Sequence, residues 1–375
     1  MRVLICPDSF KESITSSDLC KAIKKGIEQT SKNHKIVSQP ISDGGDGLLE
    51  ILSTTLNVRL YETIVTGPIG NRVSSKYGIG EVNGAIIGIV ESAEGNGLHL
   101  VPLAHRNPMT TTSQGVGELL MKVLEHKPEK IIIGLGGSAT NDGGLGMLQG
   151  LGFSCKNGKG DAVGQGNEHL SELESIGIPL NHPILSTSLD IASDVTNPLL
   201  GPNGATYVFS RQKGATVSQL ELMEMNMAHY AMIAQKTLGK DISSIPGSGA
   251  AGGLGAAFFG FTNSTIRSGF EIVADWVGLE EKIASADIII TGEGKIDLQT
   301  IQGKAPSGVA SLAQKYNKRI LAVCGILEND KTIDEYFDEI IPLSRVAIPI
   351  TESIANAEKL AIETGAYIAE KYLKD

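Results

Sequence analysis

Three short segments of the chain combine carboxylates with lysine or glycine, residue types that suit phosphoryl transfer and metal binding. They are PDSFKES at 7–13, SDGGDG at 42–47 and TGEGKID at 291–297. Each follows an apolar run typical of a buried strand. Ligands of open parallel sheets bind at the carboxyl ends of the strands, so these distant side chains are expected to meet at one edge. The candidates for substrate binding are Asp8, Ser9, Lys11, Asp43, Asp46, Glu293 and Lys295, and Asp297 and Lys11 are candidates for catalysis.

Each segment also has an interpretation without a ligand. Asp8 can be a turn residue, and Lys11 can be a solvated side chain of a first helical turn. Asp43 and Asp46 can cap a helix, although one acid is enough for a cap and paired glycines favour close backbone approach to something. The alternating charges of residues 293–297 can form a local ion pair on the surface. The coincidence of all three segments on one expected edge favours a ligand site.

The middle of the chain holds three more polar or Gly-rich segments: GLGGSATNDGG at 134–144, SDVTNPL at 193–199 and GSGAAGGLGAA at 247–257. Backbone N–H groups of a Gly-rich loop can bind phosphate oxygens, and Asp and Asn oxygens suit Mg²⁺. A turn or packing role is the alternative for each segment. The candidates for nucleotide binding are Gly136, Gly137, Ser138, Thr140, Asn141, Asn197, Gly252 and Gly253. The candidates for catalysis in this part of the chain are Asp190 and Asp194. The candidates for metal binding are Asp43 and Asp194.

These groups together fit phosphoryl transfer, in which a protein positions the reactants and neutralises charge. No GxxxxGK[ST] occurs in the chain, so it is not a P-loop enzyme. GLGGSA and GSGAAG formally match dinucleotide-binding patterns. The first lacks a suitable strand after it and the second lacks one before it, so both matches are interpreted as accidental.

Composition excludes several other classes of protein. The chain has 375 residues, of which 41% are hydrophobic and 20% charged, as in a globular enzyme of two domains. A net charge of −10 with no basic stripe argues against nucleic-acid binding. The N-terminus turns polar too early for a signal peptide, and no apolar run approaches the roughly 18 residues of a membrane span. The four cysteines form no metal-binding pattern, and a cytoplasmic location is expected.

The two ends of the chain are expected to form one domain. Near both ends, apolar strand-like runs alternate with helical patterns, including a helix that begins after Thr15 and a last helix at 352–373. This alternation is typical of a parallel sheet with right-handed crossovers. Residues 1–65 and 280–375 are therefore expected to form a flavodoxin-like or Rossmann-like α/β domain that is discontinuous in sequence.

The middle of the chain has a different pattern of expected strands and helices. Short strand-like pieces around an Asn83-Gly84 turn indicate antiparallel hairpins, and a long helix is expected between Thr216 and Leu238. Residues 66–279 are therefore expected to form an inserted α/β domain with a mixed sheet.

Taken together, the segments resemble those of the bacterial glycerate kinases. The matching stretches run in order from residue 7 to residue 310 and cover nearly the whole chain; each is weak alone, but the ordered set is specific. They are PDSFKES, SDGGDG, NPMTTTSQGVGELL, GLGGSATNDGG, SDVTNPLLGPNGATYVFSRQKGA, GSGAAGGLGAA and TGEGKIDLQTIQGKAPSGVA. Glu12 departs from the pattern, because members of the family commonly have glycine there, and this bears on how closely a ligand approaches that backbone.

The resemblance implies phosphorylation of glycerate by ATP with Mg²⁺, in a cleft between a Rossmann-like domain and a second α/β domain. It leans toward the 2-hydroxyl of glycerate, whereas the residues themselves leave the 2- and 3-hydroxyls open. Within this chemistry, Asp190 or Asp194 is expected to be the base or a metal ligand, and Lys11 and Lys295 are expected to bind phosphate or carboxylate groups. The other expected acids are Asp43, Asp46 and Asp297, and the residues expected on the nucleotide phosphates or the substrate are Ser138, Thr140 and Asn141.

Two other functions stay open at this point. One is a non-catalytic protein that binds a small acid, and the other is an NAD-dependent hydroxyacid dehydrogenase. The sequence leaves the oligomeric state open as well, and a homodimer is one option.

Overall fold

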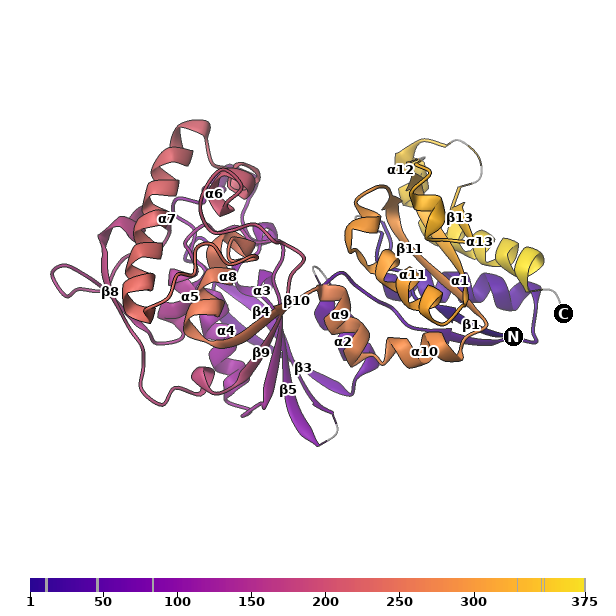
Figure 1. The fold of residues 1–375 in the computed structure, drawn as a ribbon, viewed down its shortest axis with the longest axis horizontal. Coiled ribbons are helices and arrows are strands. Elements are labelled where there is room, and N and C mark those ends of the chain that lie inside the picture. Colours follow the sequence, from indigo (N-terminus) through magenta and orange to yellow (C-terminus); the bar gives the residue numbers. More distant parts are fainter. Residues whose placement is uncertain are drawn as a thin grey trace. The chain divides into compact units, whose positions relative to one another are not determined.

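The computed structural model describes residues 1–10, 13–44, 47–82, 84–328, 330–344, 346 and 348–373. The chain divides into two compact units (Figure 1): unit 1 comprises Met1–Asp43 and Phe270–Asp375, and unit 2 comprises Gly44–Gly269. These boundaries differ from the expected ones at 65/66 and 279/280. Residues 44–65 fall in unit 2 because strand β3 (Val58–Thr66) pairs along its length with strand β4 (Arg72–Val82).

Unit 1 contains a parallel sheet of five strands in the order β13-β12-β11-β1-β2. Counted along the chain within this unit, the order is 2-1-3-4-5, which is that of flavodoxin-like sheets, and the order reverses between β1 and β11. The expected flavodoxin-like domain is therefore confirmed. Its strands are β1 (Arg2–Ile5), β2 (Lys35–Ser38), β11 (Ile288–Ile296), β12 (Arg319–Leu327) and β13 (Glu339–Pro342).

Helices cover both faces of this sheet. α1 and α13 share a core with the strands on one face, while α10 and α11 pack against β1, β11 and β12. α1 begins as predicted, with the Asp18 N–H donating to Thr15 Oγ1 at 3.2 Å. α1 and α13 approach closely at Gly26, where a Cβ would lie 1.9 Å from the Ile362 carbonyl oxygen. The helices are α1 (Ser16–Thr30), α9 (Gly269–Trp276), α10 (Leu279–Ser285), α11 (Ala305–Lys315), α12 (Ile350–Ala355) and α13 (Ala357–Tyr372), and the 3₁₀ turns are Thr300–Gln302 and Ile333–Glu335.

Two elements of unit 1 differ from expectation. TGEGKID was expected to be a loop, but most of it continues β11, because this strand stays paired with β12 as far as Ile296 and Leu327. The last helix was expected to run unbroken over 352–373, but it is divided into α12 and α13 at Asn356, which lies at φ −110° and ψ 15°.

Unit 2 contains a sheet of six strands in the order β10-β9-β6-β5-β4-β3. β3, β4 and β5 are antiparallel neighbours, whereas β5, β6, β9 and β10 run parallel, so the expected mixed sheet is confirmed. β4 and β5 pair as far as Val82 and Ala85, which flank the expected turn, although Asn83 lies outside the described residues. The remaining strands are β5 (Ala85–Glu91), β6 (Lys130–Gly134), β9 (Ser188–Ala192) and β10 (Asn263–Arg267), with a separate hairpin of β7 (Ser154–Asn157) and β8 (Leu173–Gly177).

A large hydrophobic cluster of unit 2 lies on one face of this sheet. Alternate residues of β6 and β9, such as Ile133 and Ile191, are fully buried there against the helices. α7 starts with the predicted capping box of Thr216 and Gln219. The helices are α2 (Leu48–Thr55), α3 (Ala93–Asn96), α4 (Gln114–Leu124), α5 (Leu145–Gly150), α6 (Ala205–Phe209), α7 (Val217–Leu238) and α8 (Ala250–Phe261), and the 3₁₀ turns are Leu98–Leu100, Leu103–His105, Asn167–Glu172, Pro183–Leu185 and Arg211–Lys213.

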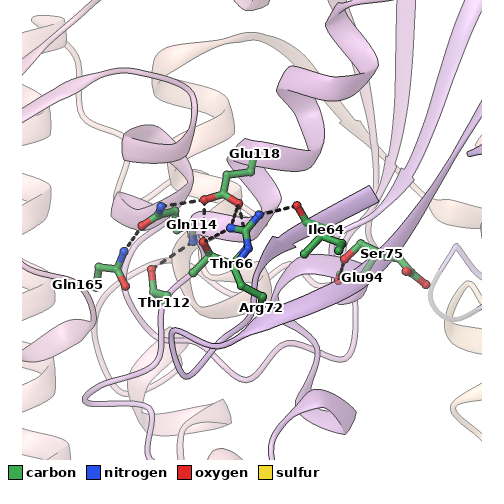
Figure 2. Close-up of polar contacts among 9 residues, drawn as sticks. All are labelled: Ile64, Thr66, Arg72, Ser75, Glu94, Thr112, Gln114, Glu118 and Gln165. Atoms are coloured by element: carbon green, nitrogen blue, oxygen red, sulfur yellow. Dashed lines mark hydrogen bonds and ion pairs between the residues drawn. The ribbon is translucent and has the colours of Figure 1, made fainter. Parts of the chain in front are cut away.

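A polar network fastens α4 to the antiparallel part of the sheet (Figure 2). The Glu118 carboxylate accepts the Thr66 N–H at 2.8 Å and the Thr66 hydroxyl at 2.7 Å, and it pairs with Arg72 at 3.2 Å. Gln114 donates to the same carboxylate at 2.8 Å. Burial raises the pKa of Glu118, but the bonds from Thr66 and Gln114 and the Arg72 charge outweigh it and the pKa is lowered.

The first and last residues of unit 2 lie side by side. Gly44 has a φ of +84°, and a Cβ on it would lie 2.3 Å from the Cα of Gly269. The same region is fastened by Asp194, whose carboxylate accepts the Gly269 N–H at 3.1 Å. Glycine at position 44 is therefore required both by its backbone angle and by the close approach of the two chain segments.

Among the residues that the structure describes, none of the helices combines the length and apolarity that a membrane crossing requires. All four cysteines are buried free thiols.

Candidate functional site

A cavity of about 680 Å³ opens in unit 1 over the carboxyl ends of β1, β11, β12 and β13. It lies at the point where the strand order reverses, which is where open α/β sheets bind ligands. One side of it, here called the polar wall, is formed by charged and hydroxyl side chains. These are Asp8, Ser9, Asp43, Glu293, Lys295, Asp297 and Lys304.

Asp8 is held three residues after the end of β1. Its N–H donates to the Gly292 carbonyl of β11 at 2.8 Å, and its carboxylate accepts the Ser9 N–H at 2.6 Å. The residue is 8% exposed. The backbone of two neighbouring strands therefore sets the position of this carboxylate, as the parallel sheet predicted.

Glu293 carries a buried oxygen that has no hydrogen-bond partner within the described ranges. The residue lies on β11. Its Oε2 accepts a hydrogen bond from Lys304 Nζ at 3.1 Å, whereas its Oε1 is buried and unpaired. The residue is only 9% exposed. Since buried carboxylate oxygens are normally hydrogen-bonded, Oε1 is a candidate ligand-binding atom.

Lys295 and Asp297 form an ion pair at the end of β11. The Lys295 ammonium lies 3.0 Å from Asp297 and 2.8 Å from Glu328. Bonds to Glu328 and Asp297 raise the pKa of Lys295. Burial raises the pKa of Asp297, but the bonds from Lys295 and the Gln299 N–H, together with the charge of Lys304, outweigh it and the pKa is lowered. The ion-pair interpretation of residues 293–297 is thus correct in geometry, and the pair also lines the cavity.

In unit 2, the loop after β6 is held by a buried polar cluster. Lys213 is 4% exposed, and its ammonium donates to Ser138 Oγ and to the Thr140 carbonyl, each at 2.8 Å. Burial lowers the pKa of Lys213 to about 7, although the nearby Asp142 acts in the opposite direction. The loop is therefore fastened from beneath by a lysine that lies 75 residues along the chain.

Asp142 fixes the far end of the same loop. Its carboxylate accepts the N–H and the hydroxyl of Ser113, each at 2.8 Å, and the N–H groups of Gly144 and Gly146. Burial raises the pKa of Asp142, and these four bonds oppose that rise. Thr140 and Asn141 are fully buried beside it. Gly136 and Gly137 reach solvent, and Ser138 is 7% exposed.

The Gly-rich segment before α8 packs against this loop backbone to backbone. Gly252 lies at φ +71°, and a Cβ there would be 1.9 Å from the Thr140 carbonyl oxygen. The Gly143 N–H donates to the Gly252 carbonyl at 3.0 Å. Gly253 is equally constrained, because a Cβ on it would lie 2.6 Å from the Cα of Gly143. These contacts give both glycines a packing role, which was one of the two interpretations of the segment.

The acids of the SDVTNPL region lie apart from one another. Asp190 sits in the middle of β9 and pairs with Lys130, at the start of β6, at 2.9 Å. Asp194 follows β9, is exposed, and accepts the Gly269 N–H. The Asn197 side chain donates to the Asn203 carbonyl at 2.8 Å. Asp190 therefore points toward the amino end of β6, away from the carboxyl edge where parallel sheets bind ligands.

The structure brings together six of the substrate and catalytic candidates on the polar wall: Asp8, Ser9, Asp43, Glu293, Lys295 and Asp297. Lys11 and Asp46 lie outside the described residues. The remaining candidates belong to unit 2: Gly136, Gly137, Ser138, Thr140, Asn141, Asp190, Asp194, Asn197, Gly252 and Gly253.

Sequence reasoning missed Lys304 and Lys213. Lys304 stands directly before a helix with proline in its first turn, a signal for a helix N-terminus that was available in QGKAPSG. Lys213 lies inside a matching stretch, but no local pattern shows that it is buried.

Residues suited to Mg²⁺ are present on the polar wall, which offers the carboxylates of Asp8, Asp43, Glu293 and Asp297. No group of three His, Cys, Asp or Glu placed to hold a metal occurs in the part of the chain that the structure describes. Mg²⁺ in phosphoryl-transfer sites is commonly held by one or two carboxylates together with substrate phosphates. The donor set of the polar wall fits that kind of site.

Comparison with known proteins gives one consistent result. The model of the "Glycerate kinase family" matches residues 3–373. Glycerate 2-kinase of Escherichia coli K12 is 43% identical over 88% of this chain and 86% of its own, and glycerate kinase of Bacillus subtilis 168 is 38% identical over 98% and 97%. The crystal structure of a protein assigned as glycerate kinase 2 in Salmonella typhimurium LT2 has a TM-score of 0.88 at 38% identity, covering 99% of this chain and 97% of that one. The chain therefore belongs to the glycerate kinase family.

Proposed function

We propose that the chain transfers the γ-phosphoryl group of ATP to the 2-hydroxyl of glycerate in the cytoplasm, and that the polar wall of the unit 1 cavity carries the chemistry. The observation that carries this proposal is the meeting of Asp8, Asp43, Glu293 and Lys295 from three distant segments in one cavity. The similarity to a glycerate 2-kinase favours the 2-hydroxyl. The four free cysteines suit a reducing compartment.

Glu293 is the residue we assign to the acceptor hydroxyl. Lys304 holds one carboxylate oxygen, and the unpaired Oε1 accepts the hydrogen bond and then the proton of the attacking hydroxyl. The glycerate oxygen forms a bond to the γ-phosphorus while the bond from that phosphorus to the β,γ-bridging oxygen breaks, and ADP leaves. A positioned acid or base of this kind typically contributes about 10²- to 10⁴-fold in rate.

We assign different roles to Lys295 and to the acids Asp8 and Asp43. Lys295 neutralises charge on the transferred phosphoryl group, and its partners Asp297 and Glu328 hold its ammonium in place. Asp8 and Asp43 are the residues we assign to Mg²⁺. When bound, Mg²⁺ supplies neutralisation of the phosphate charges.

Several unit 2 candidates receive structural roles in this proposal. Asp190 neutralises Lys130, and Gly252 and Gly253 permit close packing of two loops. Ser138, with the partly exposed Gly136 and the exposed Gly137, stays a prediction for phosphate or substrate contact.

The test is glycerate-dependent release of ADP. Purified protein is mixed with ATP, MgCl₂ and D-glycerate, and ADP is followed by a coupled assay against a control without glycerate. ADP release only with glycerate is the expected result, and phosphorus NMR should show 2-phosphoglycerate. Saturable glycerate binding without ADP would instead establish a binding protein, and an NAD(H) absorbance change with the same acid would establish a dehydrogenase. A 3-phosphoglycerate signal would overturn the choice of hydroxyl alone.

A further inference from the structure

The other side of the unit 1 cavity is apolar, and much of it is open to solvent. Ile326, Val346, Ile350 and Ile354 line it and are respectively 41%, 71%, 55% and 38% exposed. Single exposed apolar side chains are ordinary, but four on one cavity form a patch of the kind that marks a binding surface. We call this side the apolar wall.

Three neighbouring elements build the apolar wall. Ile326 comes from the end of β12, Val346 from the segment after β13, and Ile350 and Ile354 stand four residues apart on α12, so they share one side of that helix. Leu343, which is 3% exposed, also lines the cavity. The apolar wall thus lies over β12 and β13, whereas the polar wall lies over β1 and β11.

The size of the cavity exceeds what glycerate needs. Glycerate has about seven non-hydrogen atoms and fills roughly 200 Å³ at about 30 Å³ per water-sized group. The cavity holds about 680 Å³. A volume of this size with one apolar and one charged side suits a ligand that has a flat apolar part and an anionic part.

A nucleoside triphosphate has both parts. Its base is a flat ring that gains from burial, and its phosphates need cations such as Lys295 and Lys304, which line the same cavity. The buried loops of unit 2 suit it less well, because Thr140 and Asn141 are fully buried and the Thr140 carbonyl is already bonded to Lys213.

We propose that the nucleotide binds in unit 1, with its base against the apolar wall at Ile326, Ile350 and Ile354 and its phosphates toward Lys295 and Lys304. This inference rests on the proposed kinase activity, and it places the nucleotide in unit 1, whereas the residues expected from the sequence to bind it lie in unit 2.

The test uses charged substitutions at exposed positions of the apolar wall. Ile350→Asp and Ile354→Asp are made in the full chain, with Leu180→Asp as the control, since Leu180 is 94% exposed in unit 2. We expect KM for ATP to rise at least tenfold in both wall variants while KM for glycerate at saturating ATP stays within twofold. Inhibition by inorganic tripolyphosphate, which has phosphates but no base, should be unchanged. The Leu180 variant should match the parent protein in all three measurements.

Other outcomes overturn the inference. An unchanged KM for ATP in both wall variants would mean that the base binds elsewhere. A rise in KM for glycerate alone would show that the apolar wall binds glycerate instead of the base. A change of oligomeric state in size-exclusion chromatography would show that the apolar wall is a contact between copies of the chain.

Calorimetric titration of the parent protein and Ile350→Asp with ATP, without glycerate, separates this inference from the proposed function. One result is that no glycerate-dependent ADP release is seen, but ATP binds the parent protein at least tenfold more tightly than the variant. That result would support the nucleotide site and contradict the proposed reaction. If glycerate-dependent ADP release is observed but the parent protein and Ile350→Asp bind ATP with the same affinity, the reaction is supported and the nucleotide site is contradicted.

Discussion

The Glu293 carboxylate is bonded at one oxygen to Lys304 and has a buried, unpaired second oxygen. Glu293→Gln keeps the volume of the side chain but removes its ability to accept a proton. We expect kcat to fall about 100- to 1000-fold, while the free energy of unfolding changes by no more than about 1 kcal/mol. Steady-state ADP release and urea unfolding measure the two quantities.

The control for that substitution is Glu280→Gln. Glu280 forms an exposed ion pair with Lys315 in the same unit, away from the cavity lining, so turnover should be unchanged. A Glu293 variant that turns over at the parent rate would remove Glu293 from the reaction.

Lys213 makes stability depend on pH in an unusual direction. Burial lowers its pKa to about 7 in the folded protein, from 10.5. Between these two values the unfolded chain binds a proton that the folded protein lacks, so stability rises with pH across this window. Below about pH 7 the lysine is protonated in both states, so it adds no further pH dependence, but the full cost of burying its charge is present. Relative to Lys213→Met, the free energy of unfolding should increase by up to about 1.4 kcal/mol per pH unit above pH 7. Urea unfolding of both proteins at pH 7, 8 and 9 tests this, and parallel pH profiles would contradict it.

The placement of single residues was only partly predictable from sequence. Asp8 and Glu293 could be assigned to one edge because parallel strands end there together. The alternation in SLDIA puts Asp190 on the face opposite Leu189, but the pairing register that places Lys130 beside it is not readable from a single sequence. The contact between Lys213 and Ser138 joins residues with no periodic relation, so no local signal could show it.

At the scale of elements, the packing of two Gly-rich segments in unit 2 depends on positions without side chains. Gly252 and Gly239 have nearly the same φ, +71° and +69°, but a Cβ on Gly252 would lie 1.9 Å from a backbone oxygen, whereas one on Gly239 would have nothing within 4 Å. Gly239→Ala should therefore cost about 1–2 kcal/mol for its backbone angle alone. Gly252→Ala should cost about 3 kcal/mol or more, because overpacking is added.

Chemical unfolding of the two alanine variants compares these costs directly. Equal losses of stability would show that the loops can separate to make room for a Cβ.

The Glu118 network gives α4 its own pH dependence. The pKa of Glu118 is lowered from 4.5, so its contribution to stability is fully present above pH 4.5 and is lost as the pH falls through the lower folded value. Glu118→Gln should cost about 1.5–3 kcal/mol near neutral pH, because several bonds to a charged group are weakened. The difference from the parent protein should shrink at acid pH.

Glu125→Gln is the matched control for this prediction. Its ion pair with Lys122 is exposed, so the change should stay within about 1 kcal/mol. Unfolding followed at pH 7 and pH 4 tests both variants, and a pH-independent loss in Glu118→Gln would contradict the assigned role.

Elements with a clear period were predictable, and their ends were less so. The alternation of strands and helices predicted the sheet of unit 1, and the Thr216–Gln219 spacing predicted the start of α7. TGEGKID was assigned to a loop because of its glycines and charges. Pairing with β12, which is a tertiary effect, keeps it in the strand.

At the scale of the whole molecule, the division into two units was predictable, because the two ends of the chain share one strand–helix pattern and the middle does not. The first boundary was predicted at 65/66 instead of 43/44, because the sequence pattern of α2 and β3 continues that of the first domain. The pairing of β3 with β4 and the packing of α2 against β3, β4 and β5 assign them to unit 2.

The adjacency of Gly44 and Gly269 makes unit 2 a cassette, which here means a segment whose first and last residues lie side by side. Because its two ends meet, Gly44–Gly269 expressed alone should unfold in one cooperative transition by circular dichroism. Asp43 and Phe270 are each one peptide bond from these glycines, so they lie within roughly 11 Å of each other, and a linker of a few glycines could close unit 1 without the cassette. An isolated segment 44–269 that stays unfolded would show that the cassette needs its host. If it folds, the same two glycines mark where a circular permutant of the enzyme can be opened or a different domain inserted.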